Sequence, residues 1–355
     1  MTGSVELTGD APERLGYLDG WRALAIVSLL WGHFFETAYI NLGAFGVELF
    51  FVLSGRLMAE ILFFCRIDIG TFVRRRISRI VPALFVFTTA TVLFAQLFPF
   101  FGKDYSGFAD WPSFLAAWLF LYNYYDFFFG GAWWFNHLWS LSVEEHCYML
   151  LAAVVILTTR NRRHATGVAL ALGFACMISG VLQANLLDIG GHDLYWRTDV
   201  RAASVLVPFG LYLALKELLA LKAGRWLMWV SPVGFALGFC FSLNSFPEWM
   251  HYSLGTLSLS IAVVTLDATA KPLLGLLGTR PLAWLGNVSF SLYLWQQPFY
   301  VQRASIGVWL GLAACVILAL VSYYTIERPG RTYLNTHWRS DRQRSMAATT
   351  VSQNA

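Results

Sequence analysis

Charged side chains are scarce in this chain: only 13% of its 355 residues are Asp, Glu, Lys or Arg, whereas 57% are hydrophobic. A soluble protein usually carries about 25% charged residues, because its surface must remain wetted by water. The deficit excludes an ordinary soluble domain. It predicts an all-α integral membrane protein, in which lipid covers the apolar surface and helices satisfy their own backbone hydrogen bonds.

Metal-binding and export signals are also lacking. The five cysteines form neither a CxxC pair nor a metal-ligand spacing with histidine, so we predict no metal site and interpret them as small buried hydrophobic residues. The first fifteen residues are polar and mixed in charge, and we therefore expect no cleaved signal peptide. The net charge of only +4 gives no indication of nucleic-acid binding.

Ten apolar segments approach the length of a membrane-spanning helix, which is about 20 residues. We place them at about 18–39, 44–64, 80–98, 138–158, 166–184, 202–220, 227–243, 252–268, 281–300 and 306–326. Cytoplasmic loops are enriched in arginine and lysine, and with the N-terminus inside, the basic loops all fall on one side. The outer connections then hold only Lys103, Arg197, Arg201 and Arg303.

This count predicts a bundle of about ten transmembrane helices with both termini in the cytoplasm. We expect a cytoplasmic N-terminal segment over 1–17, a transmembrane domain over 18–329, and a disordered cytoplasmic tail over 330–355. The longest outer connection, 99–136, is rich in aromatic residues that suit either a membrane-surface belt or sugar stacking. Its portion 111–125 is apolar enough for an interfacial or re-entrant helix.

The first segment carries ionisable side chains where they are energetically costly. Asp19 and Arg22 lie near its cytoplasmic end, and His33 follows eleven residues after Arg22. Eleven residues make about three helical turns, or about 16 Å, so Arg22 and His33 share a face. Arg22 can hold an anion, and a buried, mostly neutral His33 suits a general base. The alternative is a structural histidine bonded to a neighbouring helix.

Arginines and carboxylates recur in later segments. Arg76 and Arg79 are three residues apart on one helical face, which suits phosphate binding, although a basic anchor to anionic lipid is the alternative. His137 and Glu144 share a face of the fourth segment. Glu144 could orient a catalytic histidine, bind an acceptor hydroxyl or pair with Arg201.

Further polar positions mark the second, ninth and tenth segments. Arg56 is predicted to snorkel or pair with an acid, and Gly55 permits close helix contact or a break in the helix. The ninth segment carries Tyr293 and Gln296 as polar interior groups. Pro329 is predicted to stop the last helix at the inner surface.

Seven motifs, taken in order, resemble the acyltransferase family 3 membrane proteins, which modify lipopolysaccharide O-antigens, exopolysaccharides, peptidoglycan, Nod factors and macrolides. The motifs are LDGWRALAIVSLLWGHF, GVELFFVLSGRLM, RRISRIVP, HLWSLSVEEHCY, TDVRAASVL, GNVSFSLYLWQQPF and ERP. The resemblance covers 18–329. It implies a ten-helix core with both termini inside, in agreement with the distribution of basic residues.

The resemblance also implies a chemistry. Acyl-CoA would bind from the cytoplasm with its phosphates on Arg22, Arg76 and Arg79, and His33 would be the catalytic residue, as base or as transient acyl carrier. We add Glu144 as a second catalytic residue. The residues predicted to contact substrate are His137, Asp19, Arg201 and Tyr293.

The chain departs from the family pattern at three positions. Members often carry histidine where this chain has Gln296. The dipeptide Cys147–Tyr148 stands where the family usually has Phe-Tyr, and Arg56 stands where it usually has an apolar residue. No SGNH-type hydrolase domain follows Pro329, so we expect transfer to be completed within the membrane domain.

We therefore predict a membrane O-acyltransferase, placed in a bacterial inner membrane among its lipids. It would move an acyl group, by default the acetyl group that is commonest in the family, from acyl-CoA to a hydroxyl of a cell-surface glycan or glycolipid. One alternative is a transporter or flippase of a glycan or lipid intermediate, although no inverted repeat supports it. The other is an inactive scaffold. The sequence does not indicate an oligomeric state.

Overall fold

The computed structural model describes residues 16–35, 37–97, 107–220 and 226–338. Within these ranges the fold is helical, and the only β-type pairing is an isolated bridge between Ile40 and Leu243. The all-α class is thereby confirmed. Residues 1–15 of the predicted N-terminal segment and 339–355 of the predicted tail lie outside the described residues.

Ten helical segments of the described chain coincide in position with the ten predicted spans. They are α1 (Gly16–Phe34), α2 (Leu42–Ala59) with η1 (Glu60–Phe64), α3 (Ile69–Leu97), α6 (Leu138–Leu157), α7 (Arg162–Leu186), α9 (Thr198–Arg201) with α10 (Ala203–Ala220), α11 (Leu227–Phe241), η4 (His251–Gly255) with α13 (Thr256–Val264), α15 (Arg280–Val301), and α17 (Val308–Ser322) with η6 (Tyr323–Glu327). The shorter elements are α4 (Trp111–Trp118), α5 (Tyr122–Phe129), η3 (Trp133–Phe135), α8 (His192–Tyr195), α12 (Glu248–Met250), η5 (Leu266–Ala268), α14 (Lys271–Leu277), α16 (Arg303–Ile306) and α18 (Arg328–His337).

Among the described residues, five helices are long and apolar enough to cross a membrane: Ile69–Leu97, Leu138–Leu157, Arg162–Leu186, Thr198–Leu219 and Val308–His337. Large apolar side chains lie exposed on their surfaces, including Leu157 and Leu310, where a soluble protein would place polar groups. The chain is therefore a membrane protein. That all ten segments cross, and that both termini face the cytoplasm, stay predictions.

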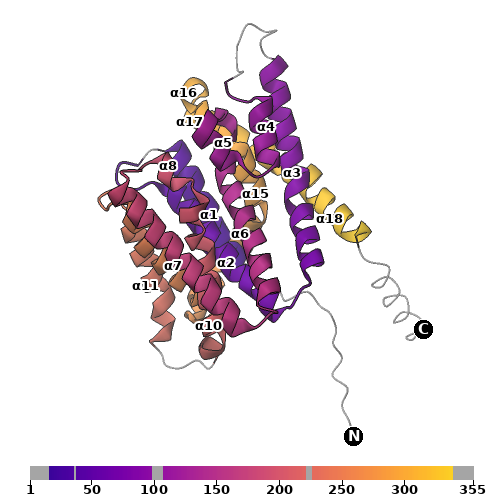
Figure 1. The fold of residues 1–355 in the computed structure, drawn as a ribbon. Helices are drawn as coiled ribbons and strands as arrows, with labels where there is room; N and C mark the ends of the chain where they lie inside the picture. Colours follow the sequence, from indigo (N-terminus) through magenta and orange to yellow (C-terminus); the bar gives the residue numbers. More distant parts are fainter. Residues whose placement is uncertain (1–15, 36, 98–106, 221–225, 339–355) are drawn as a thin grey trace, which may run out of the picture.

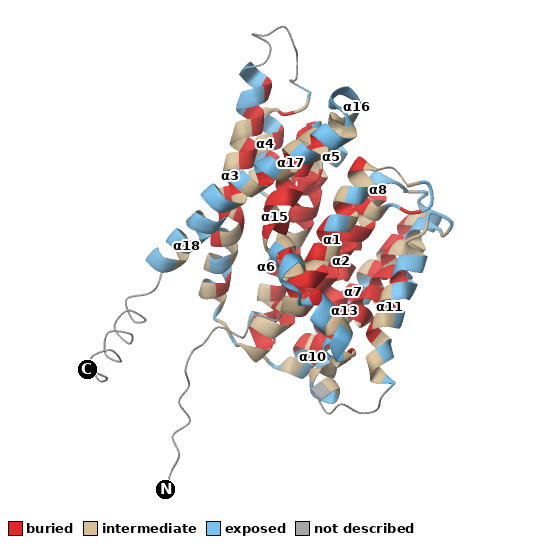
Figure 2. Ribbon diagram, turned by 180° about the vertical axis from the view of Figure 1, so that it is seen from behind, coloured by how far each residue is buried: buried red, intermediate tan, exposed pale blue. Residues whose placement is uncertain are grey.

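The central helices are α1, α2 and α15. Helix α1 packs against both α2 and α15, and α2 packs in turn against α10 and α13. Figure 1 shows α7, α10 and α11 on one side of this centre and α3 with α18 on the other. Figure 2 shows buried residues along α1, α2 and α15, whereas α18 is largely exposed. Helices α4, α5, α8 and α16, which belong to the predicted outer connections, gather at one end of the bundle (Figure 1).

Glycines allow the central helices to approach closely. A Cβ at Gly46 would lie 2.5 Å from the carbonyl oxygen of Ala25 in α1, and a Cβ at Gly55 would lie 2.1 Å from that of Val205 in α10. Close contact is therefore the role of Gly55, and α2 continues unbroken through it. The helix changes only at Glu60, where the π-helical turn η1 begins.

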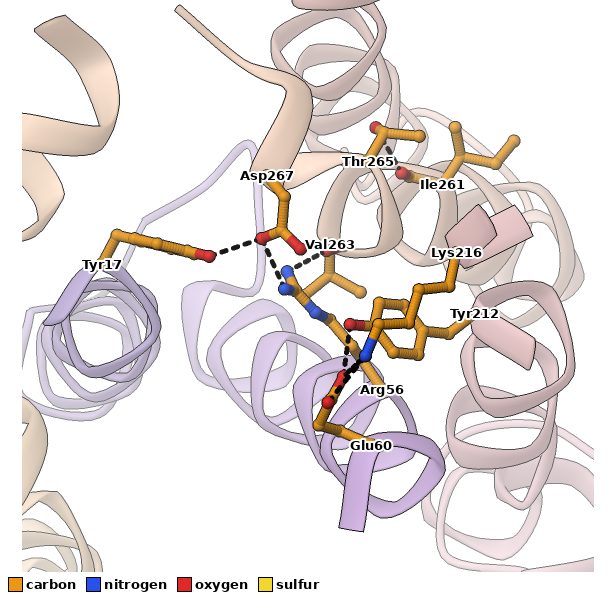
Figure 3. Close-up of polar contacts among 9 residues, drawn as sticks. All are labelled: Tyr17, Arg56, Glu60, Tyr212, Lys216, Ile261, Val263, Thr265 and Asp267. Atoms are coloured by element: carbon orange, nitrogen blue, oxygen red, sulfur yellow. Dashed lines mark hydrogen bonds and ion pairs between the residues drawn. The ribbon is translucent and has the colours of Figure 1, made fainter. Parts of the chain in front are cut away.

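A partly buried set of polar contacts joins α1, α2 with η1, α10, α13 and η5 (Figure 3). Arg56, 2% exposed, donates to Asp267 at 2.6 Å and to the carbonyl oxygen of Val263 at 2.7 Å. The Tyr17 hydroxyl donates to the same carboxylate at 2.6 Å. Beside it, Lys216 donates to Glu60 at 2.6 Å. Arg56 thus pairs with an acid rather than snorkelling, which lowers the cost of burying its charge.

Three expectations about local structure are wrong. The last helix does not stop at Pro329, because proline is tolerated in a first helical turn, and α18 continues to His337. The apolar portion 111–125 forms not one helix but α4 and the first half of α5, separated near Phe120, which has a φ of 54°. Cys240 is exposed, although Cys147 and Cys315 are buried as expected.

Candidate active site

A narrow pocket of about 90 Å³ lies between α1, α2, α3, α6 and α15, and we call it the inner pocket. Its lining includes Arg22, Arg76 and Arg79, the three arginines for which the sequence predicts phosphate contacts, together with Glu144 and Tyr148. These side chains come from three different helices. The structure therefore brings the predicted basic residues into one site, as the spacing of Arg76 and Arg79 on one face of α3 requires.

The three arginines differ in how far their charges are compensated. Arg76 donates to Glu145 at 2.7 Å, lies 3.8 Å from Glu144, and stacks over Tyr148. Arg22 donates to Asp19 at 2.8 Å. Arg79 makes no ion pair with any residue in the described ranges. Since an arginine without an acidic partner is the better phosphate ligand, Arg79 is the strongest anion-binding candidate of the three.

Glu144 belongs to the inner pocket. Its carboxylate accepts hydrogen bonds from Ser54 at 2.7 Å and from the Tyr148 hydroxyl. It does not pair with Arg201, because that arginine is held by Glu48. The alternative in which Glu144 pairs with Arg201 is therefore wrong, and the side chain that contacts His33 is not Glu144.

A larger cavity of about 740 Å³, which we call the outer cavity, lies at the other end of α1. His33, His137 and Arg201 line it, with many aromatic and amide side chains from α6, α15 and the segment around α8. Arg22 and His33 are thus at opposite ends of one helix, the first in the inner pocket and the second in the outer cavity. Asp19 lines neither and serves as the partner of Arg22.

His33 is held on two sides. Its Nδ1 lies 2.6 Å from Oε1 of Gln296, and its ring stacks on Tyr300 with 4.5 Å between centroids. The Gln296 amide nitrogen donates to Oε1 of Gln297 at 3.2 Å, which leaves the Gln296 oxygen facing His33. A neutral His33 therefore carries its proton on Nδ1 and a lone pair on Nε2. An unprotonated Nε2 is what a general base or a nucleophile requires.

The room for the His33 ring depends on a glycine. A Cβ at Gly43, at the start of α2, would lie 2.8 Å from both Cδ2 and Nε2 of His33. Any larger residue would push the ring away from its place. Gly43 also lines the outer cavity, so the Nε2 side of the ring lies along the cavity wall.

His137 and Arg201 are held very differently in the outer cavity. His137 is 5% exposed, and neither of its ring nitrogens has a hydrogen-bond partner among the described residues. Arg201, 2% exposed, is paired with Glu48, which also accepts from Thr256 at 2.7 Å. A buried imidazole without partners is costly, so His137, like the Tyr195 hydroxyl, would be stabilised by a polar ligand in this cavity.

The inner pocket and the outer cavity meet at two side chains. Val47 of α2 and Tyr293 of α15 line both. The Tyr293 hydroxyl lies 2.7 Å from Oγ of Ser140 and donates to the carbonyl oxygen of His137. We call Val47 and Tyr293 the partition, since they separate the arginines on one side from the histidines on the other.

Sequence reasoning missed Gln296 as the partner of His33, although it singled out this position as a departure. A signal was present, because Gln296 lies three residues after Tyr293 on the same helical face. Glu48 of α2, which holds Arg201, was also missed as its partner. In the described ranges, no three His, Cys, Asp or Glu side chains are grouped closely enough to hold a metal ion.

The geometry defines a helical membrane protein with a basic pocket and a histidine-bearing cavity placed back to back. The model of the acyltransferase domain family matches residues 15–328. The chain belongs to this family, as its seven motifs indicate. No solved structure matches the chain.

Curated relatives match along most of the chain. YrhL of Bacillus subtilis is 28% identical over 351 residues, which cover 89% of this chain and 54% of the relative. The peptidoglycan O-acetyltransferase OatA of Listeria monocytogenes is 27% identical, with 88% of this chain and 55% of the relative covered. The O-acetyltransferase OatA of Staphylococcus aureus is 28% identical, with 90% and 58% covered. The chain thus spans little more than half the length of these relatives.

Proposed function

We propose that the protein is a membrane O-acetyltransferase that moves an acetyl group from acetyl-CoA in the cytoplasm to a hydroxyl of a cell-wall glycan. The observation that carries this proposal is the meeting of the inner pocket and the outer cavity at Val47 and Tyr293. Membership of the acyltransferase family supports the reaction class, and the printed names of the relatives support acetyl transfer to a glycan. The membrane would be the bacterial inner membrane.

The donor occupies the inner pocket from the side of Arg22. Its phosphates contact Arg79 and the neighbouring arginines, and its slender acyl-bearing end points toward the partition. The pocket, at about 90 Å³, is too small for a nucleotide, because sites for such ligands usually measure about 300–1,000 Å³. The nucleotide therefore stays at the mouth of the pocket, and only the thioester reaches Val47.

The acceptor occupies the outer cavity. Nε2 of His33 takes the proton from its hydroxyl, the oxygen forms a bond to the thioester carbonyl carbon, and the carbon–sulfur bond breaks. The thiolate of CoA leaves with the electron pair and receives the proton. His137 offers a ring nitrogen to hold the acceptor, and the enclosure of both reactants supplies proximity. Glu144 acts on the donor side, through its contact with Arg76, rather than on His33.

The test uses detergent-purified protein, acetyl-CoA labelled in the acetyl group, and glycan fragments that lack O-acetyl groups. We expect label in the glycan and release of free CoA that depends on the acceptor. His33→Ala should abolish both while acetyl-CoA still binds in calorimetry. A protein that binds no acyl-CoA, or an active His33→Ala variant, would overturn the proposal, and the first result would favour the transporter.

A further inference from the structure

A second, smaller pocket adjoins the outer cavity. It measures about 210 Å³ and lies between α5 and the segment that contains α8. His192 and Trp196 line both spaces, and their rings stack with 5.0 Å between centroids. We call it the side pocket. Because it shares two wall residues with the outer cavity, the two spaces are neighbours on either side of the His192–Trp196 stack.

The side pocket contains an unsatisfied buried acceptor. Asn123 is 2% exposed and lines the pocket. Its amide nitrogen donates to the Trp196 carbonyl and to Thr198 Oγ1, both at 3.1 Å. These two bonds fix the orientation of the amide, and Oδ1 is left with no partner in the described part of the chain. Since a buried polar atom without a partner is costly, this oxygen calls for a ligand that donates a hydrogen bond.

The remaining lining combines aromatic faces with hydrogen-bond acceptors. Phe127 and Phe128 are 42% and 68% exposed, and the carboxylates of Asp126 and Asp193 lie beside them. The one arginine, Arg197, is paired with Asp199 at 3.0 Å. An anionic ligand would therefore meet two acids and no uncompensated cation. The lining suits a neutral ring with one apolar face and hydroxyl or amide donors at its edge.

We propose that the side pocket binds a second sugar unit, hydroxyl- or acetamido-bearing, of an acceptor whose reacting unit lies in the outer cavity. The acceptor is then an oligosaccharide that crosses the His192–Trp196 stack. This inference rests on the proposed acetyl transfer to a glycan. It adds that the enzyme selects for chain length, and that the residues responsible lie in α5 and α8 and not beside His33.

The experiment compares two acceptors, a monosaccharide and a hexasaccharide of N-acetylated sugars, with the purified full chain and labelled acetyl-CoA. Wild type should show kcat/KM at least about tenfold higher for the hexasaccharide, which corresponds to one or two additional hydrogen bonds. Phe128→Ala and Asp193→Ala, both at exposed positions, should lose most of this preference and keep the monosaccharide rate.

Phe129→Ala is the matched control. Phe129 lies on the same helix and is 77% exposed, but it does not line the side pocket, so this variant should retain the wild-type preference. If wild type acetylates both acceptors equally, or if Phe128→Ala and Asp193→Ala keep the preference, the side pocket is not a sugar site although the acetyl transfer stands. If wild type acetylates neither glycan, both proposals fail.

Discussion

The hydrogen bond between His33 and Gln296 gives the sharpest test of how the histidine works. Gln296→Leu keeps the approximate volume of a side chain that is fully buried but removes the acceptor at 2.6 Å from Nδ1. The Nδ1 proton is then left unsatisfied, and the ring is free to place its proton on Nε2. Leaving a buried donor without a partner costs about 1–3 kcal/mol. If this cost appears in the transition state, kcat falls by about 5- to 150-fold.

The assay is steady-state transfer of labelled acetyl to a glycan, with acetyl-CoA binding measured separately by calorimetry. We expect Gln296→Leu to lower kcat and to leave the dissociation constant of acetyl-CoA unchanged, because the donor binds on the far side of the partition. Gln296→Glu is the control. It retains an acceptor oxygen at the same place and should keep much more activity than the leucine variant.

Two results would refute this reasoning. A Gln296→Leu variant with wild-type kcat would show that the bond does not set the tautomer of His33. Equal losses in the leucine and glutamate variants would show that the amide nitrogen, through its bond to Gln297, matters more than the oxygen.

Three further predictions follow from the site. Gly43→Ala should strongly reduce acetyl transfer, since the added Cβ would displace the His33 ring, and it should leave acetyl-CoA binding unchanged. Normal kinetics in a folded Gly43→Ala variant would show that the His33 ring does not need the space beside Gly43. Arg79→Ala should raise KM for acetyl-CoA by about tenfold or more, because charge-assisted bonds to phosphate are among the strongest hydrogen bonds. Arg75→Ala, exposed on the same helix, should match wild type, and equal KM values for the two variants would exclude the phosphate role. Val47→Ala should widen the partition and raise the rate with propionyl-CoA relative to acetyl-CoA, measured as a ratio of kcat/KM; an unchanged ratio would argue against Val47 as a limit on acyl size.

The sequence predicted the elements of this site better than their contacts. Apolar length alone located most of the helices within a few residues, although α3 begins at Ile69, well before the predicted span. The three-residue spacing of Arg76 and Arg79 was enough to place both in one pocket. The partner of His33 was out of reach, because Gln296 lies 263 positions away and the contact depends on how α15 packs against α1. Spacing within a single helix carries no such information.

Arg201 shows the same limit. The sequence offered Glu144 as a partner for it, but Glu48 of α2 is the carboxylate that holds it. The choice follows from the close approach of α2 to α10 at Gly55, which places Glu48 against Arg201. Only the packed bundle decides which charges are compensated and which, like that of Arg79, remain available.

The partition also bears on electrical balance across the membrane. When the acetyl group moves outward and the CoA thiolate stays behind, one positive charge has formally crossed the membrane. The membrane potential opposes this movement by about 2.3 kcal/mol per 100 mV. If the proton that the acceptor gives to His33 passes inward to the thiolate, the two movements cancel. Val47 and Tyr293 would then separate two aqueous compartments across which one acyl group is exchanged for one proton, so that the reaction neither draws on the membrane potential nor dissipates it.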